Sequence, residues 1–460
     1  MIQGYYLEGK GDERAVFDYF FRTNPFGGGY VLFSGLEELL PLLERFRYPR
    51  VALDYLASLG FRDAFLRFLE DFRFRGDLYA VWEGEVVFPN EPVVRVEGTI
   101  LEAQVIETML LNILNFGSLV ATKASRIRQA AGPDAVISDF GMRRAQGVAA
   151  LQASRAAIVG GFDTTSNVAA ALMYGLEPTG TMAHSWIQSF PDELTAFRRY
   201  AAFYEDRCVL LVDTYDTLRS GVPNAIRVAH ELEARGKKLL AIRLDSGDLA
   251  YLSKKARKML DEAGLPYVKI IASNQLDETI IRSLNDQGAR IDIYGVGTRL
   301  VTGAPDAALD GVYKIAVDNG TPVMKISENI QKMTLPGRKN VVRYTNGEGL
   351  FAGDAIILEE EEGMPERFYH PLFPEKSKDV SGAEGERLLR PVMREGQVVV
   401  PPEGPAAAAA RARRRLQHLD DSHKRFENPH IYKVGISEAL MRLRDEVKEN
   451  ILRKVKGRTE

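Results

Sequence analysis

Between residues 135 and 317 short apolar runs alternate with segments of helical spacing, and this alternation constrains the fold more than any other feature. Strands that alternate with helices predict a parallel sheet with the helices packed outside it. Eight such strands suit a closed (β/α) barrel of roughly 200 residues. An open doubly wound sheet is the alternative, because a count of strands does not establish closure. No G-x-G-x-x-G motif follows any run, which disfavours the dinucleotide-binding form of that sheet. The eight runs are Ala135–Phe140, Ile158–Phe162, Thr179–Ala183, Val209–Val212, Leu239–Leu244, Val268–Ala272, Ile291–Val296 and Val312–Val317.

The 460 residues are too many for one ordinary core, so we expect two or three domains. The first hundred or so residues mix strand-like and helical patterns, and a helical pattern over residues 98–128 leads into the alternating region. Pro401–Pro405 reads as a linker before two helical stretches, 406–416 and 437–455. The tail from residue 396 carries no motif to which we assign a role. Its basic cluster favours a solvated helix face over a contact with RNA or an acidic substrate; the cluster is Arg411, Arg413, Arg414 and Arg415.

The overall composition excludes several classes of function. The 60 basic and 63 acidic residues give a net charge of −3, whereas nucleic-acid and membrane-surface binding depend on a strongly basic face. No apolar stretch approaches the ~18 to 20 residues of a membrane helix, and the first residues lack the layout of a signal peptide. Cys208 is the only cysteine, which excludes an internal disulfide and a cysteine-built zinc site and favours a buried core thiol. We therefore expect a cytoplasmic enzyme that acts on small molecules.

Small polar or glycine-rich segments directly follow seven of the apolar runs. One such segment is an ordinary turn or helix cap, but seven in succession predict a shared site, because the chemistry of a barrel lies at the carboxyl ends of its strands. Glycine, serine and threonine suit phosphate oxygens, and arginine suits a carboxylate or a phosphate. Asp213, Asp245 and Asp248 are candidate Mg²⁺ ligands. His184 is the only histidine in these segments and the candidate for nucleophilic or acid–base work. The segments are 139–147, 160–167, 181–185, 213–217, 243–248, 273–274 and 295–298.

Structural interpretations of the two most reactive side chains stay open at this point. Arg243 and Asp245 are two residues apart on one predicted strand, so their side chains share a face of the sheet. An internal ion pair with one of the nearby aspartates is the structural alternative to a substrate contact for Arg243. Considered alone, His184 is more often a core or helix-capping histidine than a nucleophile.

These segments, taken in order, resemble the nicotinate phosphoribosyltransferase family. No single motif is decisive, but the ordered set is highly specific, and the resemblance covers roughly residues 1–395. The motifs that carry it are Pro25–Gly28, Phe140–Gly147, Gly161–Asn167, Gly180–Ser185, Leu211–Asp216, Arg243–Asp248, Gly295–Thr298 and Thr334–Lys339.

The resemblance implies an α/β fold of the type II phosphoribosyltransferase kind, in which an irregular (β/α) barrel packs on an α/β domain. We expect a discontinuous α/β domain of residues 1–115 and 325–395, a catalytic barrel of residues 116–324, and a C-terminal helical extension of residues 396–460. The implied reaction is ligase-type and belongs to NAD salvage. It joins nicotinate to phosphoribosyl pyrophosphate, gives nicotinate mononucleotide and pyrophosphate, and is coupled to ATP hydrolysis. Mg²⁺ and a homodimer are expected with it.

The resemblance also implies roles for single residues. In the family, the histidine that matches His184 is transiently phosphorylated by ATP. The residues that match Thr181 and Arg243 contact nicotinate, and the one that matches Thr298 contacts the phosphoribosyl donor. The complete expected site has His184, Asp213 and Asp245 as catalytic residues, Thr181, Arg243, Arg143, Ser273, Asn274, Gly297 and Thr298 as substrate-binding residues, and Asp245 and Asp248 as Mg²⁺ ligands.

One departure from the family pattern concerns the start of the chain. The pattern opens with T-D-x-Y-x-x-T-M, whose tyrosine lines the nicotinate pocket across a dimer. Met1 aligns with the final methionine, and we transfer no role to Tyr5 or Tyr6.

Three other functions remain as alternatives. The first is an enzyme that uses nicotinamide or quinolinate. The second is a non-catalytic homologue that binds pyridine nucleotides or phosphoribosyl ligands, against which the retained His184 and Arg243 argue. The third is a phosphosugar aldolase or isomerase, which needs a Schiff-base lysine or an acid–base pair at a strand end, and the sequence has neither there.

Overall fold

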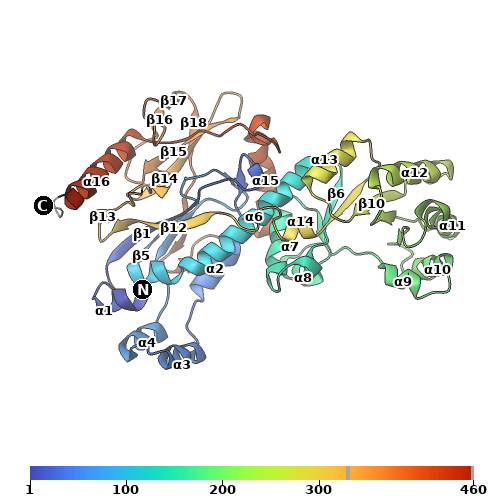
Figure 1. Ribbon diagram of the computed structural model, residues 1–460, viewed down its shortest axis with the longest axis horizontal. Helices are drawn as coiled ribbons and strands as arrows, with labels where there is room; N and C mark the ends of the chain where they lie inside the picture. The colour runs from blue at the N-terminus through green and yellow to red at the C-terminus, as the bar shows by residue number, and fades with distance from the viewer. Residues whose placement is uncertain (328–331, 457–460) are drawn as a thin grey trace. The chain divides into compact units, whose positions relative to one another are not determined.

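The computed structural model describes residues 1–327 and 332–456. Residues 328–331 and 457–460, which fall in the expected α/β domain and C-terminal extension, lie outside the described residues. The chain divides into two compact units, one of residues 1–119 with 308–460 and the other of residues 120–307 (Figure 1). We call them the discontinuous unit and the central unit.

A parallel sheet of six strands forms the centre of the central unit, in the order β7-β6-β11-β10-β9-β8. Five of these strands lie where the sequence predicts strands, because each is a short, largely buried apolar run. They are β6 (Val136–Asp139), β8 (Val209–Leu211), β9 (Ala241–Leu244), β10 (Lys269–Ser273) and β11 (Ile293–Val296). The sixth, β7, is the short pair Thr164–Thr165 beside β6.

The other three predicted strands of the barrel are wrong in place or kind. Residues 158–162 form the end of helix α7 (Ala149–Val159) and a turn, because the alanine-rich stretch before them continues its helix through Ile158 and Val159. Residues 179–183 form no strand, and the neighbouring Pro178 makes only a single bridge to Thr165. Residues 312–317 lie in β12 (Gly311–Asp318), which pairs antiparallel with β1 (Arg14–Phe21) in the discontinuous unit. A short apolar run does not reveal its partner, so all three errors have a common origin.

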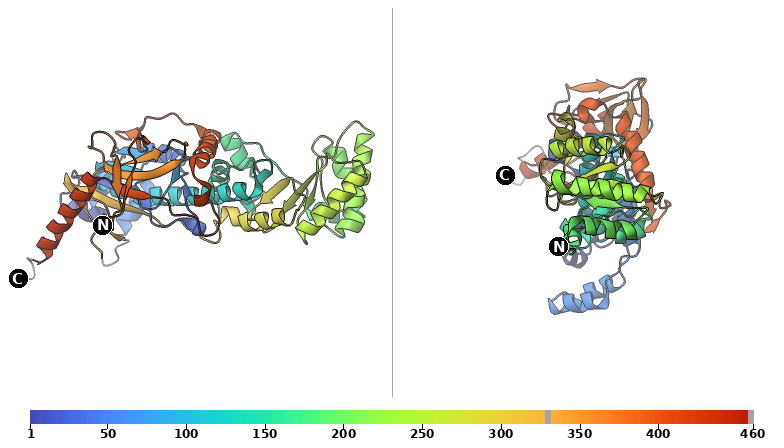
Figure 2. Two further views of the ribbon diagram at one scale, coloured as in Figure 1. Left: turned by 90° about the horizontal axis from the view of Figure 1, so that it is seen from above. Right: turned by 90° about the vertical axis from the view of Figure 1, so that its right-hand side faces the viewer.

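Helices of the central unit follow the strands and begin at side-chain caps. Asn167, Asp192, Asp248 and Asp277 each accept a hydrogen bond from a backbone N–H in the first turn of the helix they precede. Figure 2 shows α10, α11 and α12 stacked side by side, and neighbours in this stack are in contact. The helices are α8 (Val168–Tyr174), α9 (His184–Gln188), α10 (Glu193–Phe203), α11 (Val222–Glu233), α12 (Leu249–Glu262), α13 (Glu278–Asp286) and α14 (Thr298–Val301). A further helix, α6 (Glu107–Ala131), begins in the discontinuous unit and ends in this one.

A sheet of seven strands and a sheet of six strands form most of the discontinuous unit. The first has the order β13-β12-β1-β5-β3-β19-β20, and the second β17-β16-β21-β15-β14-β18; β2 (Val31–Leu32) and β4 (Val86–Val87) form a separate pair. The remaining strands are β3 (Asp77–Ala80), β5 (Val94–Thr99), β13 (Thr321–Pro322), β14 (Lys339–Thr345), β15 (Phe351–Leu358), β16 (Arg367–Tyr369), β17 (Ser377–Asp379), β18 (Glu384–Arg387), β19 (Arg390–Arg394), β20 (Gln397–Val398) and β21 (Val434–Ile436). The helices are α1 (Ile2–Leu7), α2 (Leu36–Glu44), α3 (Arg50–Ser58), α4 (Asp63–Glu70), α5 (Ile100–Val105), α15 (Gly404–His418) and α16 (Glu438–Lys456).

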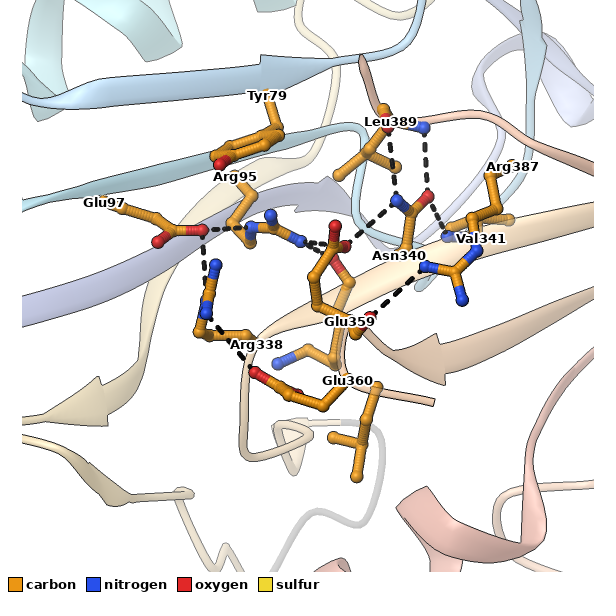
Figure 3. A network of polar contacts seen from close by, with 12 residues as sticks. Tyr79, Arg95, Glu97, Arg338, Asn340, Val341, Glu359, Glu360, Arg387 and Leu389 are labelled. Atoms are coloured by element: carbon orange, nitrogen blue, oxygen red, sulfur yellow. Dashed lines mark hydrogen bonds and ion pairs between the residues drawn. The ribbon is translucent and has the colours of Figure 1, made fainter. Parts of the chain in front are cut away.

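A buried polar network joins the two sheets of this unit (Figure 3). Arg95 of β5 is fully buried, donates to the carbonyl of Lys339 at 2.5 Å and pairs with Glu359 at 2.7 Å and Glu97 at 2.8 Å. Its guanidinium carbon lies 4.1 Å from the ring centroid of Tyr79. The charge is thus compensated on several sides, as a buried arginine requires.

The C-terminal residues belong to the discontinuous unit. Strand β21 pairs in parallel with β15, and Arg415 of α15 pairs with Glu85 at 2.7 Å. Arg411 pairs with Glu403 at 2.6 Å, so half of the basic cluster serves structural contacts, while Arg413 and Arg414 are exposed. Among the described residues, no helix has the length and apolar character needed to cross a membrane.

Candidate active site

The carboxyl ends of the parallel strands meet at one edge of the central sheet. Because β6, β11, β10, β9 and β8 run in the same direction, the segments that follow them collect at that edge. Most of the predicted site residues lie in these segments or at the last residues of these strands. Thr181 and His184 instead come after α8, in a part of the chain that follows none of these five strands.

Arg243 is the centre of a cluster of hydrogen bonds. Its Nε donates to Ser273 Oγ at 2.9 Å, Nη1 to Thr181 Oγ1 at 2.7 Å, and Nη2 to Asp245 Oδ1 at 2.9 Å. Ser273 Oγ also donates to Asp245 Oδ1 at 2.5 Å. The Arg243 side chain is only 14% exposed. The structure thus contains the ion pair that the sequence left open, and it also brings together Thr181, Arg243 and Ser273.

Phe140 provides an aromatic surface beside this cluster, and we did not single it out from the sequence. The guanidinium carbon of Arg243 lies 5.3 Å from the centroid of its ring. The ring also packs against Gly295, where a Cβ atom would lie 2.6 Å from two ring carbons. Gly295 is therefore required by the close approach of Phe140, and this requirement supplies a reason for the glycine in that motif.

His184, the first residue of α9, lies on the other side of Asp245. Its Nδ1 is 3.0 Å from Thr214 Oγ1, and its Nε2 is 3.8 Å from Asp245 Oδ2. The side chain is 39% exposed, so it is not a core histidine. When Nδ1–H donates to Thr214, Nε2 carries the free lone pair that a nucleophile needs. Thr214 is a second site residue that we did not single out from the sequence.

Asp213 ties two strand ends together. Its Oδ2 accepts from the backbone N–H of Asp245 at 2.8 Å and from Ser246 Oγ at 2.6 Å. Its Oδ1 is buried and has no hydrogen-bond partner among the described residues. Asp248 has a different position, because its Oδ1 caps α12 by accepting from Tyr251 N–H at 2.9 Å.

These carboxylates fit a magnesium ion that is shared with phosphate. Within the described residues no group of three or more histidine, cysteine or acidic side chains is arranged to hold a metal by itself. Mg²⁺ commonly uses only one or two carboxylates and takes its other ligands from water and substrate phosphates. The unpartnered Asp213 Oδ1 and the Asp245 Oδ2 near His184 supply two such oxygens.

The remaining predicted residues lie at the same edge but outside the cluster. Arg143 is exposed in a short 3-10 turn, Met142–Arg144, and Asn274 is exposed directly after β10. Asn274 has a φ of 85°, a left-handed conformation that asparagine tolerates better than most residues. Gly297 caps α14 and Thr298 begins it. Among the described residues no hydrogen bond joins these four to Arg243 or His184.

Cys208 lies immediately before β8 and is buried. Burial raises the pKa of its thiol to about 12, so the group is protonated and unreactive at neutral pH. The predicted core thiol is confirmed.

Comparisons with known proteins match most of the chain. The family model described as "Nicotinate phosphoribosyltransferase (NAPRTase) family" covers residues 135–351, the N-terminal domain model of the same name covers residues 1–115, and the C-terminal domain model covers residues 338–444. The nicotinate phosphoribosyltransferase of Bacillus subtilis is 45% identical over 448 residues, 95% of this chain and 91% of that protein. Nicotinate phosphoribosyltransferase pncB2 of Mycobacterium tuberculosis is 40% identical over 446 residues, 96% of this chain and 90% of that protein.

Solved structures give the same result for the fold. Human nicotinic acid phosphoribosyltransferase has a TM-score of 0.88 and 30% identity, and the match covers 97% of this chain and 98% of that chain. A nicotinate-nucleotide pyrophosphorylase from Pyrococcus furiosus has a TM-score of 0.71 and 26% identity, covering 90% of this chain and 92% of that chain. The expected α/β fold class of type II phosphoribosyltransferases is therefore confirmed.

Proposed function

The chain belongs to the nicotinate phosphoribosyltransferase family, and we propose that its site couples the transfer to ATP through His184. The transfer joins nicotinate to phosphoribosyl pyrophosphate. The bond from ribose C1 to the pyrophosphate oxygen breaks, a bond from C1 to the pyridine nitrogen forms, and pyrophosphate leaves with the bonding electrons. The arrangement that carries the proposal is Asp245 between Arg243 on one side and His184 on the other.

Arg243 is suited to the carboxylate of nicotinate. Ser273 and Asp245 fix the orientation of its guanidinium, while Nη1 donates to the neutral hydroxyl of Thr181. A carboxylate accepts a charge-assisted hydrogen bond from arginine more strongly than a hydroxyl does. Thr181 Oγ1 now donates to the Met182 carbonyl at 3.2 Å, and rotation of this hydroxyl would let it donate to the same carboxylate instead. The ring of Phe140 beside Arg243 supplies an aromatic face for the pyridine.

His184 is suited to accept the γ-phosphoryl group of ATP. The lone pair of Nε2 attacks the γ-phosphorus, the bond from that phosphorus to the β–γ bridging oxygen breaks, and ADP leaves with the electron pair. Thr214 holds Nδ1–H, and the carboxylate of Asp245 near Nε2 offsets the positive charge that the ring gains. Water then hydrolyses the phosphohistidine and releases inorganic phosphate.

We assign Mg²⁺ to Asp245 together with Asp213. Asp213 Oδ1 has no hydrogen-bond partner among the described residues, and Asp245 Oδ2 lies 3.8 Å from His184 Nε2. When bound there the ion supplies charge neutralisation to substrate phosphates. Asp248, expected as a second ligand, has Oδ1 engaged in the cap of α12, which leaves its Oδ2 for that role.

We also propose a cytoplasmic homodimer. The phosphorylated substrates of the proposed reaction are charged, are made inside cells and do not cross membranes, and this supports a cytoplasmic location. Exposed apolar side chains of α8, Val168, Leu172 and Met173, support the dimer, because such a patch usually marks a protein contact. Sedimentation equilibrium tests it, and a single species of 51.3 kDa at micromolar concentration would reject it.

A product assay decides between the proposal and its alternatives. Purified protein is incubated with phosphoribosyl pyrophosphate, Mg²⁺ and nicotinate, nicotinamide or quinolinate, each with and without ATP. We expect nicotinate mononucleotide as the dominant product and a higher rate with ATP. Preference for either other pyridine would favour the alternative transferases, and no product from any of the three would favour a non-catalytic binding protein.

A further inference from the structure

A turn of π-helix follows Thr214, the residue that hydrogen-bonds to His184. Residues Thr217–Gly221 form this turn, in which Gly221 N–H donates to Asp216 C=O at 2.9 Å, five residues back. Single π-turns of this kind are rare and concentrate at functional sites. Thr214, the hydrogen-bond partner of His184, precedes the turn by three residues.

Contacts with β8 and β9 restrain the segment that carries Thr214. At its start Asp213 accepts hydrogen bonds from Asp245 and Ser246. Gly221, the last residue of the π-turn, packs closely against the backbone of Val212, the residue after β8. A Cβ atom at Gly221 would lie 1.8 Å from the Val212 carbonyl oxygen. The position of Thr214 therefore depends on how the π-turn is held against its neighbours.

Glu193, the first residue of α10, holds the π-turn. Its Oε2 accepts from Ser220 Oγ at 2.5 Å and from Asn224 Nδ2 at 2.9 Å. The residue is only 4% exposed, so these hydrogen bonds are shielded from competing water. The position of the carboxylate at the start of a helix offsets part of the cost of its burial, because the N-terminal end of the helix carries partial positive charge.

Helix α10 also holds the other partner of the His184–Thr214 hydrogen bond. In α9, which begins at His184, Trp186 Nε1 donates to the carbonyl of Ala196 in α10 at 3.1 Å. The start of α10 thus binds the helix of His184 through Trp186 and the segment of Thr214 through Glu193. Figure 1 shows α9, α10 and α11 as neighbours at this end of the central unit.

We propose that Glu193 is a positioning residue for phosphoryl transfer to His184. By tying the π-turn to α10 it sets the distance between Thr214 Oγ1 and His184 Nδ1, and so keeps the Nδ1–H tautomer that leaves Nε2 free for attack. This inference rests on the proposed phosphorylation of His184. It adds a role for a residue that touches neither substrate nor the reacting atoms.

The test compares two alanine variants that break contacts between α10 and its neighbour α11. Glu193→Ala removes the buried link. Glu231→Ala is the matched control, because it removes the exposed pair of Glu231 with Arg198, which joins the same two helices at 2.6 Å. For each protein the rate of acid-labile phosphate incorporation from ATP, nicotinate transfer without ATP and the thermal midpoint are measured. Glu193→Gln, whose amide oxygen still accepts both hydrogen bonds, is the rescue variant.

We expect Glu193→Ala to lower phosphate incorporation at least about tenfold, because small displacements of a nucleophile carry large rate penalties. Its transfer without ATP should stay within about twofold of the wild type, Glu231→Ala should resemble the wild type in both assays, and Glu193→Gln should recover most of the incorporation. If Glu193→Ala matches Glu231→Ala, or loses both activities equally, the positioning role is rejected. If Glu193→Ala does not fold, Ser220→Ala, which removes one of the two hydrogen bonds, is judged by the same criteria.

The wild type separates failure of this inference from failure of the proposed function. Wild-type protein that forms nicotinate mononucleotide but takes no phosphate on His184 rejects the phosphohistidine and the role of Glu193 together. Wild-type protein that is phosphorylated, with a Glu193→Ala variant that is phosphorylated equally fast, rejects the role of Glu193 alone.

Discussion

At the scale of single residues, the contacts of Arg243 show that a structural ion pair and a substrate contact are compatible. Asp245 neutralises the guanidinium before substrate arrives, which makes the buried charge tolerable. The hydrogen bond to Thr181 involves a neutral acceptor, and a carboxylate accepts from arginine more strongly than a hydroxyl does. A carboxylate that takes this place adds a second negative partner without displacing the first.

The first prediction concerns the choice between nicotinate and nicotinamide. A neutral amide does not offer the charged acceptor, and a charge-assisted hydrogen bond contributes about 1.5 to 3 kcal/mol, or about 10- to 150-fold in kcat/KM. We expect the wild type to prefer nicotinate by that factor, and Arg243→Lys to lose most of it because an ammonium does not reproduce the planar fork. Steady-state kinetics with both substrates measure this. Arg198→Lys on the surface is the control, and equal kcat/KM values for acid and amide in the wild type would contradict the assignment.

The second prediction concerns Cys208. With a pKa of about 12, a fraction of about 10⁻⁴ of the thiol is ionised at pH 8, and only the thiolate reacts with alkylating reagents. We expect iodoacetamide at pH 8 to leave the native protein unmodified and to add one group per chain in urea, as read by intact mass. Modification of the native protein at the rate of the unfolded one would show that the thiol is accessible.

The sequence identifies the reactive residues of the site better than the residues that surround them. Arg243, Asp245 and His184 lie at the ends of predicted strands and carry unusual chemistry for such places, so a local pattern is enough to select them. Phe140 and Thr214 are ordinary residues whose importance depends on strand order. Phe140 follows β6 and Arg243 lies on β9, with two strands between them in the sheet, and periodicity along the chain contains no information on that order.

At the scale of elements, a buried charge cluster fixes α6 against α13 within the central unit. Glu278, the first residue of α13, pairs with Lys123 at 2.5 Å and Arg126 at 2.9 Å, and all three side chains are buried. Burial alone raises the pKa of Glu278, but the two cations outweigh it and the net pKa lies below the ordinary value of 4.5. The carboxylate is therefore more stable as an anion in the folded protein than in the unfolded chain.

The third prediction follows from this cluster. Glu278→Gln leaves two buried cations without their shared anion, and we expect a loss of about 3 to 5 kcal/mol in the free energy of unfolding at pH 7. Glu262→Gln, from an exposed pair with Lys258, should cost less than about 0.5 kcal/mol. Urea unfolding followed by circular dichroism measures both. Equal midpoints for the two variants would show that the cluster contributes nothing to stability.

The same cluster gives a pH dependence whose sign follows from linkage. Because the pKa of Glu278 is lower in the folded state, the unfolded chain binds more protons between the folded pKa and 4.5. Its contribution is complete above about pH 4.5 and is lost as the pH falls through the folded pKa. We expect the difference in unfolding free energy between wild type and Glu278→Gln to shrink from pH 7 to pH 3. A difference that stays constant over this range would contradict the lowered pKa.

The errors in the predicted elements also have a physical reason at this scale. Residues 158–162 have the apolar composition of a buried strand, and helix α7 buries the first two of them, Ile158 and Val159, equally well. The alanines that precede them decide for a helix, since alanine has the highest helix propensity. Residues 179–183 are bounded by Pro178 and His184, and the short α9 begins where a longer strand would have continued.

At the scale of the whole molecule, pairing between distant segments sets the limit of prediction from sequence. Strand β1 pairs with β12, about 300 residues later, and β21 from the tail pairs with β15. A run such as residues 312–317 reads as an eighth strand of the central region, because the local pattern is the same whichever sheet takes it. The discontinuous α/β domain was expected only from the ordered motifs of a family, which carry long-range information that periodicity lacks.

The last prediction concerns the coupling of ATP to transfer, which involves the reaction cycle as a whole. A phosphoryl group on His184 Nε2 adds nearly two negative charges beside Asp213 and Asp245, and this creates a site that favours Mg²⁺ and ordered phosphate-binding loops. Hydrolysis of the phosphohistidine removes that charge and releases the loops with the product. Displacement at ribose C1 itself needs no imidazole, because neutralised pyrophosphate and an aligned pyridine nitrogen are sufficient.

We therefore expect His184→Ala to lose ATP hydrolysis and its stimulation of transfer, while slow transfer without ATP continues. His230→Ala is the control, because this exposed histidine of α11 is paired with Glu233 at 3.0 Å and belongs to no part of the site. Intact-protein and peptide mass spectrometry under alkaline conditions should find one acid-labile phosphate on wild type and His230→Ala and none on His184→Ala. Full ATP coupling in His184→Ala would assign the histidine a purely structural or binding role.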